Sequence, residues 1–147
     1  MKPFLALLVL GCVLFTGCGP YDPKSASDLA QCYQAEFGTS PPPKIKVLNA
    51  RQMIIRDWGA QWLRLELKDD ALDEVILSRD FQKIKEPPKE FTSIDRYTPD
   101  WWQVSPIAAF EFYQNPNWTK GNWSSSRAIL AVDRTRNVAF FRCDRID

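Results

Sequence analysis

The sequence predicts an α+β domain in which two helices cover one face of a mostly antiparallel sheet of about five strands, in the order α-β-β-α-β-β-β. Three observations support this class. Apolar residues recur at helical spacing between residues 25 and 38, apolar and polar residues alternate between 61 and 67, and two apolar runs flank a short polar turn near the C-terminus. The first pattern is typical of an amphipathic helix and the other two of strands joined in hairpins.

The first helix is predicted over about Ser27 to Phe37. Ser25 and Asp28 have the spacing of a capping box, which satisfies free N–H groups at a helix start. Gly38 can adopt the left-handed conformation that ends a helix, and the prolines at 41–43 prevent its continuation. One helical face then carries Leu29, Cys32, Tyr33 and Phe37.

A hairpin is expected next, with one strand from Lys44 to Ile55, a turn at Trp58–Gly59 and a second strand over residues 61–67. Leucines at 63, 65 and 67 alternate with Trp62, Arg64 and Glu66. Side chains alternate between the two faces of a strand, so the leucines mark one buried face and the other three an outer face.

A second helix is predicted from Asp70 to about Arg79, capped by Asp69 and Asp70, with Asp73 at capping-box distance from Asp70. Residues 83–99, with prolines and many charges, suggest an irregular crossing segment. Residues 107–113 suggest a strand and 114–126 a polar loop. Runs 127–132 and 138–143 suggest a terminal hairpin, in which Asn137 suits a left-handed turn position.

The first eighteen residues form a secretory signal: Lys2 precedes an apolar run from Phe4 to Phe15, and Gly17 lies just before Cys18. The run is too short to span a bilayer, which takes roughly 20 residues. An ordinary cleaved signal and an uncleaved anchor are the alternatives, and Val9-Leu10-Gly11-Cys12 is a second local match to a lipidation site.

The segment Phe15-Thr16-Gly17-Cys18 resembles the lipobox of bacterial lipoproteins, although Phe15 stands where that pattern usually has leucine. The resemblance implies removal of residues 1–17, lipid on Cys18, a tether over 18–24 and one globular domain over 25–147. It implies anchoring in the bacterial cell envelope, and Gly19 in place of aspartate favours the periplasmic face of the outer membrane over the inner membrane.

Cys32 and Cys143 remain once Cys18 carries lipid. An even pair in an exported chain predicts a disulfide, here from the first helix to the last strand. Closing so long a loop would stabilise the fold by about 4–5 kcal/mol in the chain-entropy model. The alternative is two buried free thiols. The chain has no histidine to activate a catalytic cysteine.

Charge and composition exclude several function classes. The chain has 19 basic and 18 acidic residues, and loss of Lys2 with the signal leaves the charges balanced, so nothing favours nucleic acid. Without histidine there is neither the commonest general base nor the commonest metal ligand. We expect no metal and no cofactor.

The best candidate ligand-binding residues are Trp118 and Trp123, which lie in one polar loop flanked by asparagines and serines. Exported sugar-binding domains often present aromatic rings that stack on sugar faces. The alternative is that these tryptophans pack against the sheet and fix the loop.

Charged clusters offer weaker candidates. Asp69, Asp70, Asp73 and Glu74 suggest helix capping rather than a cation site, because a calcium loop needs a central glycine. Asp100 beside Trp101 could be a buried general acid or a turn cap. The C-terminal arginines could form a strip for phosphate or carboxylate groups of envelope polymers, or pair with Asp133, Asp144 and Asp147: Arg127, Arg134, Arg136, Arg142 and Arg145.

No catalytic motif is present, so the sequence predicts a non-enzymatic binding or structural module of the envelope, held in the membrane by lipid. Its partner would be another envelope protein or the cell-wall glycan. A carbohydrate-binding module that uses the loop tryptophans and an inhibitor or immunity-type lipoprotein are the alternatives. A hydrolase would need two carboxylates facing one cleft.

Overall fold

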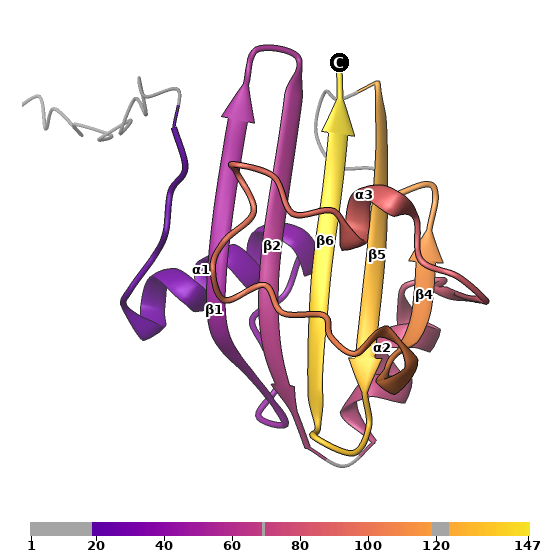
Figure 1. Ribbon diagram of the computed structural model, residues 1–147. Helices are drawn as coiled ribbons and strands as arrows, with labels where there is room; N and C mark the ends of the chain where they lie inside the picture. The colour runs from indigo at the N-terminus through magenta and orange to yellow at the C-terminus, as the bar shows by residue number, and fades with distance from the viewer. Residues whose placement is uncertain (1–18, 69, 119–123) are drawn as a thin grey trace, which may run out of the picture.

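The computed structural model describes residues 19–68, 70–118 and 124–147, and Figure 1 shows its architecture. It is an α+β fold built on one six-stranded antiparallel sheet in the order β1-β2-β6-β5-β4-β3. Its elements are α1 (Ala26–Phe37), β1 (Ile45–Ile55), β2 (Trp58–Leu67), α2 (Ala71–Ser78), β3 (Gln82–Ile84), α3 (Lys89–Thr92), the 3-10 helix η1 (Ile107–Ala109), β4 (Glu111–Asn115), β5 (Ser125–Asp133) and β6 (Val138–Ile146).

The α1 helix begins and ends where the sequence predicts. The Asp28 amide donates to Ser25 Oγ at 3.0 Å, and Gly38 has the left-handed φ of 75° with its N–H on the Gln34 carbonyl. These contacts satisfy backbone groups that a helix end leaves free. The predicted cap of α2 is wrong in its chemistry: the Asp70 side chain makes no capping hydrogen bond and pairs instead with Lys44 Nζ at 2.5 Å.

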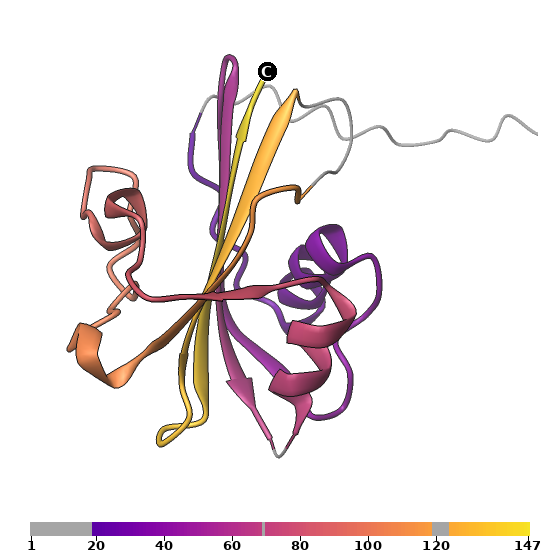
Figure 2. The same cartoon turned by 90° about the vertical axis from the view of Figure 1, so that its right-hand side faces the viewer.

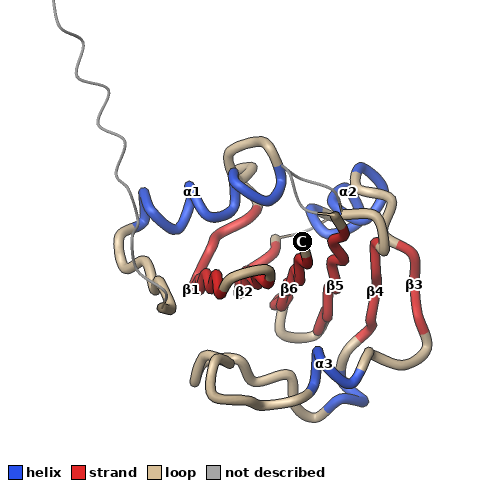
Figure 3. Tube along the Cα trace, turned by 90° about the horizontal axis from the view of Figure 1, so that it is seen from above, coloured by secondary structure: helices blue, strands red, loops and turns tan. Residues whose placement is uncertain are grey.

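Two layers of structure cover the sheet, as Figures 2 and 3 show. The helices α1 and α2 lie against one face, called here the α1 face. The segment from residue 85 to 110, with α3 and η1, crosses the other, called here the α3 face. The two predicted helices therefore lie on one face, as expected, and α3 is an additional single turn within the crossing segment on the other face.

The α1 face holds the larger core. Leu63 and Leu65 of β2 pack there with Leu130 of β5 and Phe141 of β6, against Phe37 of α1. All five side chains are fully buried. The alternation of leucines in β2 therefore predicted the correct inward face.

The α3 face is also buried over part of its area, which corrects the expectation of a hairpin with one buried face. Trp62 has no exposed surface, and it lies in a second cluster with Phe91 of α3 and Trp102 of the crossing segment. Irregular backbone gives no periodic signal in a sequence, so the cover over Trp62 could not be seen in the pattern of β2.

Several boundaries differ from the predicted ones. The β1–β2 turn lies at Arg56 and Asp57, where Arg56 has a left-handed φ of 48°, and Trp58 already belongs to β2. The irregular segment contains a sixth strand, β3, which pairs with β4. Residues 107–109 form a 3-10 turn before β4. Asn137 has φ 53°, so its predicted left-handed conformation is confirmed.

The segment after residue 18 does not leave the domain at once. Tyr21 and Gln52 exchange backbone hydrogen bonds of 2.8 and 2.9 Å, which place the segment beside β1. The Arg51 guanidinium contacts both carboxylate oxygens of Asp22 at 2.7 Å and donates to the Tyr97 carbonyl at 3.0 Å. The expected tether over 18–24 is thus attached to the sheet from Tyr21 onward.

Candidate functional site

Trp118 lies in the core and is 5% exposed, so the structure does not support it as a sugar-stacking surface. Its ring contacts those of Phe37, Phe81 and Phe141 at centroid distances of 5.4, 5.4 and 5.5 Å. Its indole N–H donates to Glu36 Oε2 at 3.0 Å. The packing alternative holds for this residue, while Trp123 lies outside the described residues.

Cys32 and Cys143 are both buried, and no bridge joins them in the structure. Cys32 is on α1 and Cys143 on β6, as the sequence predicts, and both belong to the core of the α1 face. Burial raises the pKa of the Cys32 thiol to about 11, and burial also raises the pKa of Cys143. Both thiols are therefore protonated and unreactive near neutral pH.

The segment that includes Cys18 lies outside the described residues. Among the residues that the structure describes, no helix is both long and apolar enough to cross a membrane.

The acidic candidates make structural contacts. Asp70 pairs with Lys44, and Asp73 pairs with Arg134 at 3.1 Å. No group of three or more ligating side chains that could hold a metal ion occurs in the described part of the chain. Asp100 is exposed, so it lacks the burial that would make it a general acid.

Each of the five C-terminal arginines has an acidic partner. Two of the pairs were expected from the sequence: Arg136 with Asp133 at 2.5 Å and Arg142 with Asp144 at 2.9 Å. The others bridge separate elements: Arg127 with Glu90, Arg134 with Glu111 and Asp73, and Arg145 with Glu36. Such pairs satisfy most of the positive charge, so a free basic strip is not formed.

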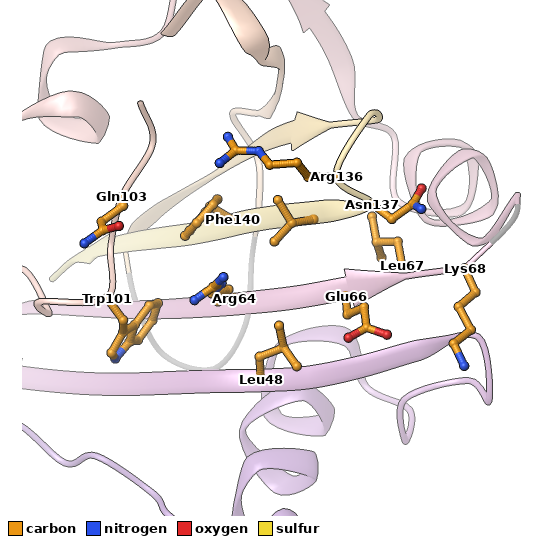
Figure 4. A pocket seen from close by; sticks show the side chains of 11 residues that line it. Leu48, Arg64, Glu66, Leu67, Lys68, Trp101, Gln103, Arg136, Asn137 and Phe140 are labelled. Carbon is orange, nitrogen blue, oxygen red and sulfur yellow. The ribbon is translucent and has the colours of Figure 1, made fainter. Parts of the chain in front are cut away.

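The candidate site is a groove of about 550 Å³ on the α3 face, at the end where β2 finishes and β6 begins. The crossing segment covers the sheet only as far as Trp101 and Gln103, and the groove lies beyond it (Figure 4). It is lined by Leu48, Arg64, Glu66, Leu67, Lys68, Trp101, Gln103, Arg136, Asn137, Val138 and Phe140.

The sheet positions the groove floor. Arg64 and Glu66 project from the α3 face of β2, and their register partners on β6 are Phe140 and Val138. On the other side, Leu48 is the additional residue of a β-bulge between Val47 and Asn49 in β1. Bulges are often found where a strand must re-aim a side chain at a binding site.

Arg64 is the unusual residue of the groove. Its Nε is buried and has no hydrogen-bond acceptor among the described residues, and its guanidinium lies 5.8 Å from the centre of the Phe140 ring. In Figure 4 it lies between Phe140 and Trp101. A buried donor without an acceptor costs about 1–3 kcal/mol, and more when it is charged. A bound carboxylate or phosphate could supply the acceptor.

The other groove charges leave a net positive site. Lys68 follows the end of β2 and Arg136 lies in the turn between β5 and β6, and Glu66 is the one carboxylate among the described residues that line the groove. Arg136 is already paired with Asp133, and its guanidinium lies 5.4 Å from the Phe110 ring. A ligand site usually combines apolar and aromatic surfaces with a few placed polar groups, and this groove contains both kinds of residue.

Arg64 and Glu66 were not predicted as site residues, because the alternation in β2 placed them on an outer face. Arg136 was a candidate within the arginine strip, and Trp101 was expected to pack in the core or to bury Asp100. The sequence offered one signal for this site: Arg64 and Glu66 are charged residues within the largely apolar run 61–67. Which part of that face the crossing segment covers depends on tertiary packing.

Comparison with protein families, with curated proteins and with solved structures finds no match to this chain.

Proposed function

We propose that this chain is a non-enzymatic binding module of the bacterial cell envelope, anchored by lipid on Cys18 at the periplasmic face of the outer membrane. In this proposal the groove on the α3 face binds an anionic group of a cell-wall polymer. The anchor is supported by the signal and its resemblance to a lipobox, and the ligand site by the groove's residues.

The binding proposal rests on one observation: the buried Nε of the Arg64 guanidinium has no hydrogen-bond acceptor among the described residues. This guanidinium is held partly buried in a 550 Å³ groove. Arg64 forms no ion pair in the described structure, whereas six other arginines each pair with a carboxylate: Arg51, Arg127, Arg134, Arg136, Arg142 and Arg145. A ligand carboxylate would give Arg64 the same kind of partner.

The groove residues support binding rather than catalysis. Hydrolysis of a glycan by the usual mechanism uses two carboxylates on opposite sides of one bond, and Glu66 is the single carboxylate among the described residues that line the groove. The chain also has no histidine to act as a base.

The anchor is tested by the intact mass of the protein extracted from a membrane fraction. We expect the mass of Cys18 onward with acyl chains, and for Cys18→Ser we expect no added lipid. An unacylated wild-type protein in the soluble fraction would contradict the anchor.

The ligand site is tested with the mature protein in detergent micelles and soluble peptidoglycan fragments that carry stem peptides, by titration calorimetry. Arg64→Gln is compared with Arg56→Gln, the same substitution at the far end of the same hairpin. We expect Arg64→Gln to weaken binding at least about tenfold, because a hydrogen bond to a charged group is lost, and Arg56→Gln to leave it unchanged. No binding by wild type, or equal binding by both variants with unchanged melting temperatures, would overturn the proposal.

A further inference from the structure

We propose that the groove recognises the peptide part of a cell-wall polymer, through a carboxylate at Arg64 and an amine at Glu66, rather than its glycan. This inference rests on the proposed function and deepens it by naming the ligand class. Its basis is the order of charges along the groove floor.

Arg64 and Glu66 near the end of β2 and Lys68, one residue beyond it, occupy alternate positions and all line the groove. Alternate residues of a strand share a face and lie roughly 7 Å apart. The floor therefore offers a positive, a negative and a second positive group in a row. Its complement is a ligand with a negative and a positive group at similar spacing.

The Glu66 carboxylate is available to a ligand. It forms no ion pair within the described residues, although Lys46 is its register partner on β1. Lys46 is exposed, while Glu66 is half-buried at the groove floor. On the β6 side its partner is Val138, which is buried and apolar. A ligand ammonium over Glu66 would gain a charge-assisted hydrogen bond that the protein itself does not supply.

Apolar side chains border the row of charges on both sides. Leu48 lies on the β1 side, and Val138 and Phe140 lie on the β6 side. These surfaces suit the aliphatic carbons that separate the charged groups of a short peptide, and Trp101 closes the end near Arg64.

The same charges disfavour the other occupants. A neutral glycan would cover Arg64 and Glu66 while leaving both without an opposite charge, which is costly in a partly buried site. A uniform polyanion would be repelled by Glu66 at the centre of the row. Charge complementarity thus selects a ligand that carries both signs.

The experiment titrates the mature protein in micelles with the stem tripeptide L-Ala-γ-D-Glu-L-Lys, its amino terminus acetylated throughout, in three forms that differ only at the lysine Nε: free, acetylated or dimethylated. Acetylation removes the positive charge, whereas dimethylation adds bulk and keeps it. We expect wild type to bind the free and dimethylated forms at least about fivefold more tightly than the acetylated form. Glu66→Gln should abolish this difference, and Glu74→Gln, an exposed carboxylate on α2, should preserve it.

The outcomes separate this inference from the function on which it rests. If all three peptides bind equally to wild type and Arg64→Gln weakens them equally, the amine is not recognised and this inference fails while the proposed function stands. The inference also fails if Glu66→Gln retains the preference for the charged forms. If neither the tripeptides nor larger peptidoglycan fragments bind, the proposed function fails as well.

Discussion

At the scale of single residues, the buried pair of Glu36 and Arg145 determines how the α1 face is built. Glu36 is 2% exposed and Arg145 is 8% exposed, and Arg145 Nη2 lies 2.6 Å from both carboxylate oxygens. Trp118 donates to the same carboxylate, so one side chain joins α1, β6 and the segment after β4. Buried charges are tolerated only when they are paired in this way.

Substitution of Glu36 by alanine should destabilise the fold strongly, because Arg145 would remain buried without a partner. Breaking a buried ion pair in this way typically costs about 3–5 kcal/mol. Urea unfolding followed by tryptophan fluorescence measures the loss. The control is Asp73→Asn, which removes an exposed partner of Arg134 and should change stability little. Equal losses of stability in the two variants would mean that the Glu36–Arg145 pair contributes no more than a surface pair.

Glu111 makes stability depend on acid. Its hydrogen bonds with Lys83, Arg134 and Tyr113 lower its pKa from 4.5 to about 2. A depressed pKa in the folded state adds stability above the ordinary value, and that stability is lost as the pH falls from about 4.5 toward 2. We expect Glu111→Gln to reduce stability near neutral pH and to flatten the curve of unfolding free energy in this range. A variant with the same acid dependence as wild type would contradict this assignment.

At the scale of elements, α1 docks on the sheet through polar as well as apolar contacts. Gln61 of β2 is fully buried and donates to the Cys32 carbonyl at 2.9 Å, and its register partner on β6 is Cys143. Both cysteines are thus neighbours of Gln61, Cys32 through its carbonyl on α1 and Cys143 through strand pairing on β6. The Cys32–Cys143 disulfide that the sequence predicts is not formed in the structure, although Glu36 and Arg145 bring the two elements that it would join into contact.

Thiol titration distinguishes two free cysteines from a Cys32–Cys143 disulfide. With burial raising the pKa of Cys32 to about 11, we expect neither cysteine of the native protein to react with Ellman's reagent at pH 8. We expect two thiols to react after denaturation without reductant, as the structure has them free. No reactive thiol in the denatured protein, followed by two after reduction, would establish the Cys32–Cys143 bridge that the sequence predicts.

At the scale of the whole molecule, the attachment of the N-terminal segment and the groove lie at opposite ends of the sheet. The segment joins β1 at Gln52, close to the β1–β2 turn, whereas Lys68 and Asn137 of the groove lie at the other end (Figure 1). Cys18 precedes Tyr21 by three positions, a reach of about 10 Å. A lipid on Cys18 would therefore hold the turn end near the bilayer and leave the groove facing away from it.

This orientation predicts a difference in quenching by lipid-embedded spin labels in proteoliposomes. Ile54 lies at the turn end of the hairpin and is 49% exposed. A fluorophore attached to Ile54→Cys should be quenched more strongly than one attached to Lys68→Cys. The two positions are separated by most of the length of β2, roughly 30 Å. Equal quenching, or stronger quenching at residue 68, would contradict the orientation.

The sequence alone determined the features that depend on near neighbours in the chain. The cap at Ser25, the stop at Gly38, the leucine face of β2 and the left-handed Asn137 each rest on local backbone chemistry or on a two-residue period. The α+β class followed from these elements, because hairpins pair antiparallel and amphipathic helices must cover a sheet.

Only the tertiary structure decided which polar and aromatic residues are enclosed. Trp62 and Arg64 are neighbours on one face of β2, yet the crossing segment covers the first and leaves the second at the floor of a groove. Trp118 and Arg145 were candidates for a surface site in the sequence, but both side chains bind Glu36, which is 82 and 109 residues away from them. Such contacts depend on the path of irregular chain and on charge pairing across long separations, which leave no periodic pattern in a sequence.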